Sequence, residues 1–437
     1  MRTLDFILIV FGKFLHFLCS YARLGSGSSF PGRMLLVIDS QIIKRWLSKQ
    51  DIKVIVVTGT NGKTTTAKLL EHILKNNNIS CFRNSSGANL FSGIASCLIK
   101  EISVFGLLKE KVAIFEIDEN VVDSFIKQAP PSMVIFLNLF RDQLDRYGEI
   151  DRIIKRWEKA LYLIPFDSVL VGNADDPQIV HLLQKAKNSI SYFGLPENQE
   201  SLKPEKNLAD IVYCPSCITR FEYKERFCGH LGLWECPKCR FSRPNVFIKE
   251  LVDVFQADSL HQYNALAALC ASEKFGICSK QARHSLQGFK PAFGRGEIVR
   301  YRKKKAHLLL AKNPISFTDS LKTLSSEKAK VVFLILNNHC QDGKDVSWIW
   351  DVDFSEVLKM EKIVISGNCA KELRLRLSYS LHQNTAPPII YTEKRVKKAL
   401  KFALSISSEE QPLFIIPTYT ALLEINKYFK GADHLCT

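Results

Sequence analysis

The stretch VIVVTGTNGKTTT, residues 54–66, decides the fold of this chain. An apolar β-branched run leads into a turn with two glycines, and a helix-forming segment follows. Such a unit directs backbone N–H groups and the positive end of a helix at an anion. Lys63 is expected to reach the β- and γ-phosphates of a nucleotide, and the Thr64 hydroxyl to ligate Mg²⁺. Val57 stands where GxxxxGK[ST] has its first glycine, so the loop is shortened. The predicted nucleotide-binding residues of this loop are Gly59, Thr60, Asn61, Gly62, Lys63, Thr64 and Thr65.

Length and composition indicate a folded cytoplasmic protein with more than one domain. A chain of 437 residues exceeds one ordinary core, and 46% hydrophobic with 24% charged residues describes a globular protein. The net charge of +16 favours an anionic partner, such as a nucleotide, a phospholipid, a nucleic acid or a phosphorylated substrate. The odd cysteine count and two CxxC pairs indicate a metal site in a reducing compartment rather than a disulfide scaffold.

Short β-branched runs alternate with helical stretches, which predicts parallel βαβ units in an α/β fold. Expected strands of the first unit are 53–59, 112–118, 132–139 and 168–175, and its helices are 63–77, 88–101, 150–163, 177–187 and 261–276. A second α/β unit is expected to have strands at 307–313, 330–338, 362–367 and 413–419. The basic run RYRKKK (300–305) reads as a solvated linker. The predicted parts are an N-terminal helical segment (1–48), an ATP-binding domain (49–298) and a C-terminal Rossmann-like α/β domain (299–437).

The apolar run at residues 4–22 has three interpretations. It can be an amphipathic helix packed on the domain, a helix on the membrane surface, or a signal or anchor. Lys13 and His16 interrupt the run, which disfavours a spanning helix.

The shortened loop TNGKTTT resembles the ATP-binding loop of the Mur ligase superfamily, whose members join an amine to a carboxylate through an acyl phosphate. Further segments are similar to family motifs in the same order: FEIDE (115–119), NLFRDQLDRYGEI (138–150), NADDP (173–177), HQYNALAA (261–268) and GRGE (294–297). The resemblance implies that Glu116 binds Mg²⁺ together with Thr64, and that Lys63 and Glu116 take part in catalysis. It also implies adenine contacts by Asn173 and Asn264, and a phosphate contact by Arg295.

Three departures from the family pattern limit these expectations. Only about fifty residues precede the loop, so the larger N-terminal domain that grips a UDP-sugar in other members is not expected. Gln143 replaces the usual histidine of the third motif, and LLAKNP (309–314) replaces D-Y-A-H-N-P. The ribose contact and the carbamoylated lysine of other members are therefore left unassigned.

CPSC (214–217) and CPKC (236–239) form the pattern C-x₂-C-x₁₈-C-x₂-C, which is typical of a zinc ribbon. Four thiolates, from Cys214, Cys217, Cys236 and Cys239, would close a tetrahedral shell around a structural zinc, in an insertion spanning about 208–247. A redox pair or unmetallated thiols are the alternatives, and Cys228 and His230 are substitute ligands. The flanks carry no concentrated basic and aromatic run, so no nucleic acid is expected.

Four aspartates and two tryptophans crowd NNHCQDGKDVSWIWDVDF, residues 337–354. One interpretation is an Asx turn capping a helix, with Trp348 and Trp350 packed nearby. The other is a functional carboxylate on a loop that follows a strand.

The ribbon, the short N-terminus and DGKDVSWIWDVDF resemble, within the superfamily, the synthetase subunits that work with a GatD-like glutamine amidotransferase. The resemblance implies a heterodimer in which the partner supplies ammonia and this chain amidates the α-carboxylate of the D-glutamyl residue of lipid II, at the inner membrane surface. Asp345 would complete the partner's Cys–His pair in trans, leaving Asp342, Asp351 and Asp353 as turn and cap residues. The implied cofactors are ATP, Mg²⁺ and a structural Zn²⁺. The alternatives are an amino-acid ligase of the folylpolyglutamate type, a zinc-ribbon nucleic-acid-binding ATPase and a regulatory pseudoenzyme.

Overall fold

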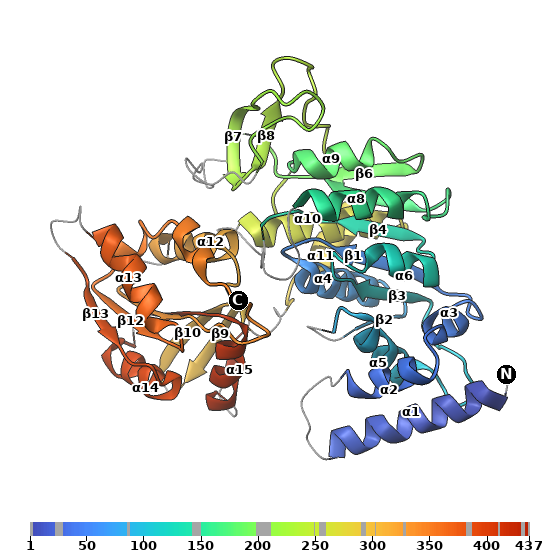
Figure 1. The fold of residues 1–437 in the computed structure, drawn as a ribbon, viewed down its shortest axis with the longest axis horizontal. Helices are drawn as coiled ribbons and strands as arrows, with labels where there is room; N and C mark the ends of the chain where they lie inside the picture. Colours follow the sequence, from blue (N-terminus) through green and yellow to red (C-terminus); the bar gives the residue numbers. More distant parts are fainter. Residues whose placement is uncertain are drawn as a thin grey trace.

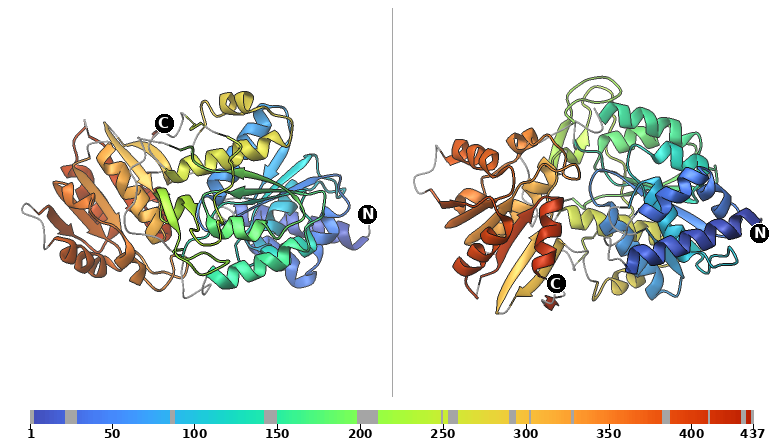
Figure 2. Two further views of the ribbon diagram at one scale, coloured as in Figure 1. Left: turned by 90° about the horizontal axis from the view of Figure 1, so that it is seen from above. Right: turned by 60° about the horizontal axis from the view of Figure 1, so that its bottom comes forward.

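The chain builds two large sheets, one parallel and one mixed, which lie side by side in Figure 1 and in both views of Figure 2. The structure is a computed structural model that describes residues 3–21, 29–84, 88–141, 150–197, 211–248, 250–252, 259–289, 294–301, 303–326, 329–381, 387–409, 411–429 and 433–435.

The elements of the first part run from residue 3 to residue 285. Its helices are α1 (Thr3–Tyr21), α2 (Phe30–Ile38), α3 (Ile42–Leu47), α4 (Lys63–Asn76), α5 (Phe91–Glu101), α6 (Val122–Gln128), α8 (Ile150–Leu161), α9 (Pro177–Leu183), α10 (Ser259–Glu273) and α11 (Ser279–Ser285). Its strands are β1 (Lys53–Thr58), β2 (Cys81–Arg83), β3 (Val112–Glu116), β4 (Met133–Phe136), β5 (Val169–Asn173), β6 (Ser189–Phe193), β7 (Glu222–Cys228) and β8 (Leu231–Glu235).

The elements of the second part follow from residue 295. Its strands are β9 (Arg295–Tyr301), β10 (Lys304–Leu309), β11 (Val331–Ile335), β12 (Lys362–Ser366), β13 (Ile389–Thr392), β14 (Leu413–Pro417) and β15 (Asp433–Leu435). Its helices are α12 (Pro314–Ser326), the 3₁₀ turns η2 (Ser347–Asp351) and η3 (Val357–Lys359), α13 (Ala370–Leu381), α14 (Val396–Ile406) and α15 (Tyr419–Tyr428).

In the described chain, the first sheet has the order β2-β3-β1-β4-β5-β6, and every pair in it is parallel. Strand β1 lies between β3 and β4, so the phosphate loop leaves from the middle of the sheet. Because parallel strands end at the same edge, the segments after β1, β3, β4 and β5 meet there. The predicted parallel α/β fold is confirmed, and so are the strands expected around residues 53, 112, 132 and 168.

Helices cover both faces of this sheet, which is why the inner strands β3 and β4 are buried along their whole length. Ile55 and Val57 of β1 face the core shared with α4 and α10, whereas Val54 and Val56 face the core shared with α5, α6 and α8. Figure 1 shows α4 and α10 on one side of β1, with α6 and α8 on the other.

The three N-terminal helices pack on α5, and close helix contact fixes their position. A Cβ on Gly32 of α2 would lie 2.0 Å from the Ser92 carbonyl oxygen and 2.5 Å from the Ser96 nitrogen of α5. Helix α1 is held by its single acidic side chain, since the Asp5 carboxylate is buried between Arg45 and Lys49, each 2.6 Å away. Burial alone would raise the pKa of Asp5, but these two cations outweigh it and hold the pKa below its usual value.

The second sheet has the order β13-β12-β11-β14-β10-β9-β15 within the described residues, with β9 and β15 antiparallel to their neighbours. Helices α12 and α13 cover one face, and α14 and α15 cover the other. The interpretation of RYRKKK as a linker is wrong, because its described residues belong to the β9–β10 hairpin. Lys304 donates to the carbonyl oxygens of Leu404 and Ser407. The proposed domain boundary between residues 298 and 299 falls inside β9.

Strands β7 and β8 form a separate hairpin, which stands at the top of the molecule in Figure 1. Its small core contains Phe221, Trp234 and two of the paired cysteines. The rings of Trp234 and Phe241 lie 4.8 Å apart. The cysteine pairs are therefore carried on an inserted unit with a core of its own.

We expect Gly32→Ala to lower the free energy of unfolding by about 1–3 kcal/mol, because the added methyl group would push α2 away from α5. Thermal unfolding followed by circular dichroism measures the change. Val37→Ala is the matched control on α2: its side chain is exposed, and the expected effect stays within about 0.5 kcal/mol. Equal unfolding midpoints for Gly32→Ala and the unmodified chain would contradict the close helix contact.

Candidate nucleotide site, cysteine cluster and acidic loop

The phosphate loop turns sharply into α4 at Gly62. Its φ of 92° lies in the left-handed region, and a Cβ at this position would lie 1.9 Å from Asn264 Oδ1 of α10. The same Asn264 oxygen accepts a hydrogen bond from Thr66 Oγ1 at 3.3 Å. Only glycine satisfies both the backbone angle and this close approach. Helix α10 thus sits directly on the start of α4, where the expected anion would bind.

Side-chain amides from two sheets hold the loop at Asn61. Asn138, after β4, accepts from the Asn61 nitrogen at 2.9 Å and donates to the Asn61 carbonyl oxygen at 3.1 Å. Asn313, at the start of α12, donates to Asn61 Oδ1 at 3.1 Å. The buried Asn61 Nδ2 has no acceptor among the residues that the structure describes. Buried N–H groups usually have a hydrogen-bond acceptor, so this one is available to donate to a bound ligand.

The predicted catalytic side chains come together at the ends of β1 and β3. Thr64 Oγ1 donates to Glu116 Oε2 at 2.7 Å, so the two expected Mg²⁺ ligands are neighbours. Lys63 Nζ lies 2.9 Å from Glu119 Oε1, a contact that the sequence did not suggest. Burial raises the pKa of Glu119, and the Lys63 charge opposes this shift.

Arg83, at the end of β2, places a further positive charge beside Glu116. Its guanidinium lies 2.6 Å from Glu71 Oε2 and 3.6 Å from Glu116 Oε1. Asn84 accepts from the Glu116 nitrogen at 2.8 Å and donates to the Glu116 carbonyl oxygen at 3.0 Å, which fixes the backbone of Glu116. The carboxylate proposed for Mg²⁺ is therefore held from the neighbouring strand.

The other predicted nucleotide contacts lie at the same edge in different surroundings. Asn173 is buried, donates to the Leu137 carbonyl oxygen at 2.9 Å and accepts from the Asp175 nitrogen at 3.0 Å. Asn264 faces the phosphate loop, as described above. Arg295 is the first residue of β9, and its side chain lies outside the described residues, as does Gln143. The adenine and phosphate roles of these residues stay predictions.

Two buried aspartates of NADDP anchor the inserted hairpin to the first sheet. Asp175 accepts from Arg243 Nε at 2.5 Å, from the Tyr263 hydroxyl at 2.7 Å and from the Leu195 nitrogen at 2.9 Å. Burial raises the pKa of Asp175 although Arg243 opposes the shift. Asp176 caps α9, and its Oδ2 lies 3.3 Å from His230 Nε2 at the turn of the hairpin. His230 therefore lies against Asp176, and the cysteine cluster is formed without it.

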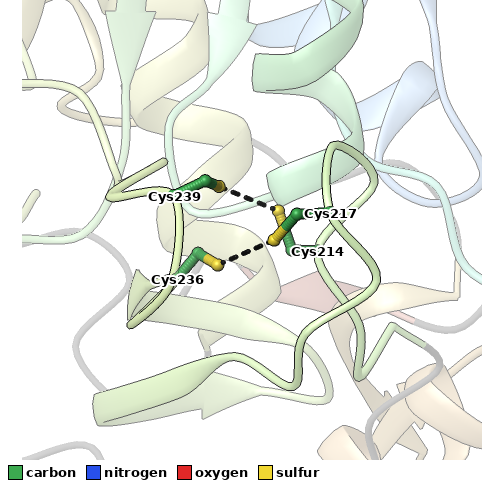
Figure 3. Close-up of side chains that lie close together, drawn as sticks. All are labelled: Cys214, Cys217, Cys236 and Cys239. Carbon is green, nitrogen blue, oxygen red and sulfur yellow. Dashed lines mark hydrogen bonds between the residues drawn. The ribbon is translucent and has the colours of Figure 1, made fainter.

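The four paired cysteines converge at one end of the hairpin, as Figure 3 shows. Their Sγ atoms all lie within 4.8 Å of one another, and those of Cys214 and Cys239 are 3.6 Å apart and those of Cys217 and Cys236 are 3.4 Å apart. Sulfurs around a tetrahedral zinc are about 3.8 Å apart, given Zn–S bonds of about 2.3 Å. The hydrogen bond with the Thr219 hydroxyl lowers the pKa of Cys217 to about 6, which favours the thiolate that a metal requires. The cluster fits a metal ion.

Asp345 lies on the loop between β11 and η2. It accepts from the Ser347 nitrogen at 2.8 Å and from Ser347 Oγ at 2.9 Å, which is the geometry of an Asx turn. Asp342 is buried and accepts from the backbone nitrogen and the hydroxyl of Thr420 at the start of α15. Trp348 packs on Phe317. The turn and cap interpretation thus describes this loop as it stands. Asp345 is half-buried, whereas Asp342 is buried and Asp351 and Asp353 are exposed.

The fold and the loop geometry define an ATP-dependent ligase of the Mur ligase type. The Mur ligase middle domain family matches residues 57–217, and the MurT ligase C-terminal family matches residues 310–422. The pseudomurein peptide ligase type C of Methanothermus fervidus shares the fold, with a TM-score of 0.68 and 20% identity over 90% of this chain and 80% of that one.

Two relatives match the chain along nearly its whole length. The lipid II isoglutaminyl synthase (glutamine-hydrolyzing) subunit MurT of Staphylococcus aureus is 31% identical, over 93% of this chain and 94% of its own. The subunit of the same name from Streptococcus pneumoniae is 29% identical, over 95% of each chain. The chain therefore belongs to the MurT family.

The sequence does not predict several residues of the site, because no motif assigns a role to them. Asn313 belongs to LLAKNP, which departs from the family segment D-Y-A-H-N-P but keeps its asparagine. This asparagine contacts Asn61 of the phosphate loop. Glu119 belongs to FEIDE (115–119), but the family resemblance gives a role only to Glu116, the first glutamate of that segment. The contact of Glu119 with Lys63 comes from the structure. Nothing in the sequence marked Arg83 or Arg243.

Proposed function

We propose that this chain is the synthetase subunit of a glutamine-dependent enzyme that amidates the α-carboxylate of the D-glutamyl residue of lipid II. The reaction uses ATP and yields D-isoglutamine in the peptidoglycan precursor. The observation that carries the proposal is the match to MurT subunits over more than nine-tenths of the chain. The enzyme works in the cytoplasm, where ATP is present, on a substrate held at the inner membrane surface.

The phosphate loop receives the ATP phosphates. Its turn at Gly62 leaves no room for a side chain, and the buried Asn61 amide N–H offers a donor to a phosphate oxygen. Lys63, now paired with Glu119, supplies the positive charge for the transferred phosphoryl group. Thr65 follows in the first turn of α4, and Asn264 borders the loop from α10.

Thr64 and Glu116 are the residues that would hold Mg²⁺. Both present oxygen atoms, which this ion prefers, and they are already within hydrogen-bonding distance of each other. When bound, the ion offsets charge that develops on the phosphoryl oxygens. Asn84 and Arg83 keep the Glu116 carboxylate at the end of β3.

The reaction proceeds in two displacements. The substrate carboxylate oxygen attacks the γ-phosphorus, the bond to the bridging oxygen breaks, and ADP leaves. The acyl phosphate then accepts ammonia at its carbonyl carbon, the bond from that carbon to the phosphate oxygen breaks, and inorganic phosphate departs with the bonding electron pair. The nitrogen gives up one proton, to the departing phosphate or to water, to leave the neutral amide. The positioned loop and lysine lower the barrier of the first step, because they stabilise charge where it forms.

Ammonia comes from a GatD-like glutamine amidotransferase that docks on the second part of the chain. Asp345 would accept from the partner's catalytic imidazole, orient it and stabilise its cationic form. Trp350 and Tyr379 are exposed, in edge contact with each other, and belong to η2 and α13 beside this loop. Exposed aromatic residues of this kind are suited to the centre of an interface.

The four cysteines bind a structural Zn²⁺. The sulfur separations support this assignment. The ion would close the base of the hairpin, whose other end is anchored by Asp175 and Asp176. Asn173 and Arg295 complete the proposed set, as supports of the adenine pocket and the phosphates respectively.

Lys63→Ala is expected to lower amide synthesis by at least roughly 10²-fold, because the charge on the phosphoryl group is lost. Partner binding should be unchanged. Mass spectrometry of lipid II after incubation with ATP and glutamine measures the product. Lys127→Ala, an exposed lysine on α6, is the matched control and should retain activity. Amidation at the unmodified rate by Lys63→Ala would overturn the assigned role of the loop.

Asp345→Asn is expected to reduce the glutaminase activity of the partner by roughly 10²–10⁴-fold, because the imidazole loses its orienting carboxylate. Glutamate release by the assembled complex is the measurement, and size-exclusion chromatography checks that the complex forms. Asp351→Asn removes a neighbouring exposed carboxylate and serves as the control. Unchanged glutamine hydrolysis in the Asp345→Asn complex would leave Asp345 as a turn residue alone.

Zinc is expected at stoichiometric content in the purified protein, and Cys236→Ser should lose most of it. Chelation should expose the buried Trp234 and shift its fluorescence to longer wavelength, since the closed end of the hairpin opens. Cys278→Ser, an exposed cysteine elsewhere, is the control. Metal analysis that finds no zinc in the unmodified protein, or equal zinc in Cys236→Ser, would refute the site.

A further inference from the structure

Helix α1 has two different faces. Leu8, Ile9 and Gly12 point inward and pack on the helices behind, where a Cβ on Gly12 would lie 2.6 Å from the Ile99 side chain. The opposite face is apolar and uncovered. It consists of Leu4, Phe6, Ile7, Val10, Phe14, Phe17, Leu18 and Tyr21.

These outward residues recur at intervals of three and four, so they form one continuous stripe along the helix. Their exposure is large, reaching 56% for Phe14, 64% for Phe17 and 82% for Tyr21. Figure 1 shows α1 at the border of the molecule, below α2 and α5 and away from the second sheet. A soluble monomer seldom presents so long an apolar surface without a partner for it.

The charges around the stripe suit an anionic surface. The one carboxylate of α1, Asp5, is turned inward and paired with Arg45 and Lys49. Residues 1–49 contain seven lysines and arginines against two aspartates. Lys13 stays at the inner border, where it donates to the Ile99 carbonyl oxygen at 3.0 Å. Helices that lie in the interface of an anionic bilayer are typically amphipathic, with basic flanking residues and without acidic side chains on the face that enters the bilayer.

Two other states of α1 fit the observations less well. Leu4–Tyr21, with a mean hydropathy of 1.6, is long and apolar enough to cross a membrane. Crossing would break both Asp5 ion pairs and the packing at Gly12. A protein partner would need polar groups to set its orientation, and the stripe offers only the Tyr21 hydroxyl.

The position of α1 also relates to the proposed active site. A cavity of about 800 Å³ lies between α1, α4, β2 and α5, and its lining includes His16 of α1 and Arg83 of β2. Arg83 is the residue that lies 3.6 Å from Glu116. Helix α1 thus borders a cavity that Arg83 helps to line. Arg83 in turn lies beside Glu116, the carboxylate proposed to bind Mg²⁺.

We propose that the outer stripe of α1 docks on the anionic inner surface of a phospholipid bilayer, with the helix parallel to the surface. The docked helix brings the cavity beside it to the level of the lipid head groups, from which a lipid-linked substrate enters. This inference rests on the proposed function for the identity of the substrate. The docking itself depends only on α1.

Flotation with vesicles tests the docking. The full-length chain in complex with its amidotransferase is mixed with vesicles of equimolar phosphatidylglycerol and phosphatidylcholine, or of phosphatidylcholine alone. The double variant Phe14→Gln, Phe17→Gln removes apolar area from the stripe and keeps a good helix former at both positions. Tyr162→Gln, Phe166→Gln is the matched control, because both side chains are at least as exposed and lie outside α1.

We expect the unmodified complex and the control to float with the phosphatidylglycerol vesicles, less so at high salt, and the stripe variant to bind at least about tenfold more weakly. Failure of the unmodified complex to float, or equal flotation of the stripe variant, would overturn the docking. So would a dimer in sedimentation that dissociates on Phe14→Gln, Phe17→Gln, since the stripe would then bind a second copy.

Two substrates separate this inference from the proposed function. The stripe variant should amidate a short-chain, water-soluble lipid II analogue at the unmodified rate and vesicle-embedded lipid II more slowly. Equal loss with both substrates would overturn the docking role, because the substitutions would then act on catalysis. If the unmodified complex amidates neither substrate but still floats, the proposed function fails and the docking stands.

Discussion

The hydrogen bonds to Asn61 are the constraint on which the nucleotide site depends. Asn138 fixes the loop backbone from the first sheet, and Asn313 fixes the Asn61 side chain from the second part of the chain. Backbone N–H groups that are left for a bound phosphate make no hydrogen bonds within their own loop, and here side-chain amides define the shape of the loop instead. Asn313 also caps α12, where its Oδ1 accepts a hydrogen bond from the Ser316 nitrogen at 2.9 Å. A displacement of α12 would therefore be transmitted directly to the phosphate loop.

A second buried centre attaches the inserted β7–β8 hairpin to the first part of the chain. A carboxylate removed from water is costly unless donors surround it, and Asp175 has Arg243, Tyr263 and the Leu195 nitrogen. These donors come from the segment after β8, from α10 and from the segment after β6. Trp234 of the hairpin donates to the Ala174 carbonyl oxygen at 3.2 Å next to it. The inserted hairpin thus packs on the turn that follows β5. The same turn leads into α9, which Asp176 caps.

Local patterns predicted the parts of the fold that are buried on both faces, and failed where contacts are long-range. The β-branched run ending at Thr58 and the glycine turn sufficed for β1, α4 and the phosphate loop. The basic composition of RYRKKK (300–305) favours a linker, although its described residues pair across the β9–β10 turn, and only the end of β10 coincides with the strand expected at 307–313. Motifs nominate Lys63, Thr64 and Glu116, and the structure brings Thr64 and Glu116 together, while the roles of all three stay predictions. No motif nominates Glu119, Asn313 or Arg243, since each acts on a residue 56 or more positions away and no local spacing encodes that contact.

The two interpretations of Asp345 are compatible on physical grounds. Each carboxylate oxygen has two acceptor sites, and Ser347 occupies one on Oδ1 through its nitrogen and one on Oδ2 through its hydroxyl. An Asx turn therefore leaves acceptor capacity on both oxygens while it fixes the rotamer of the side chain. A carboxylate that must orient an imidazole on another protein needs such a fixed rotamer, because every freely rotating bond would add an entropic cost to assembly. On this reasoning the turn would hold the half-buried Asp345 ready for the proposed partner.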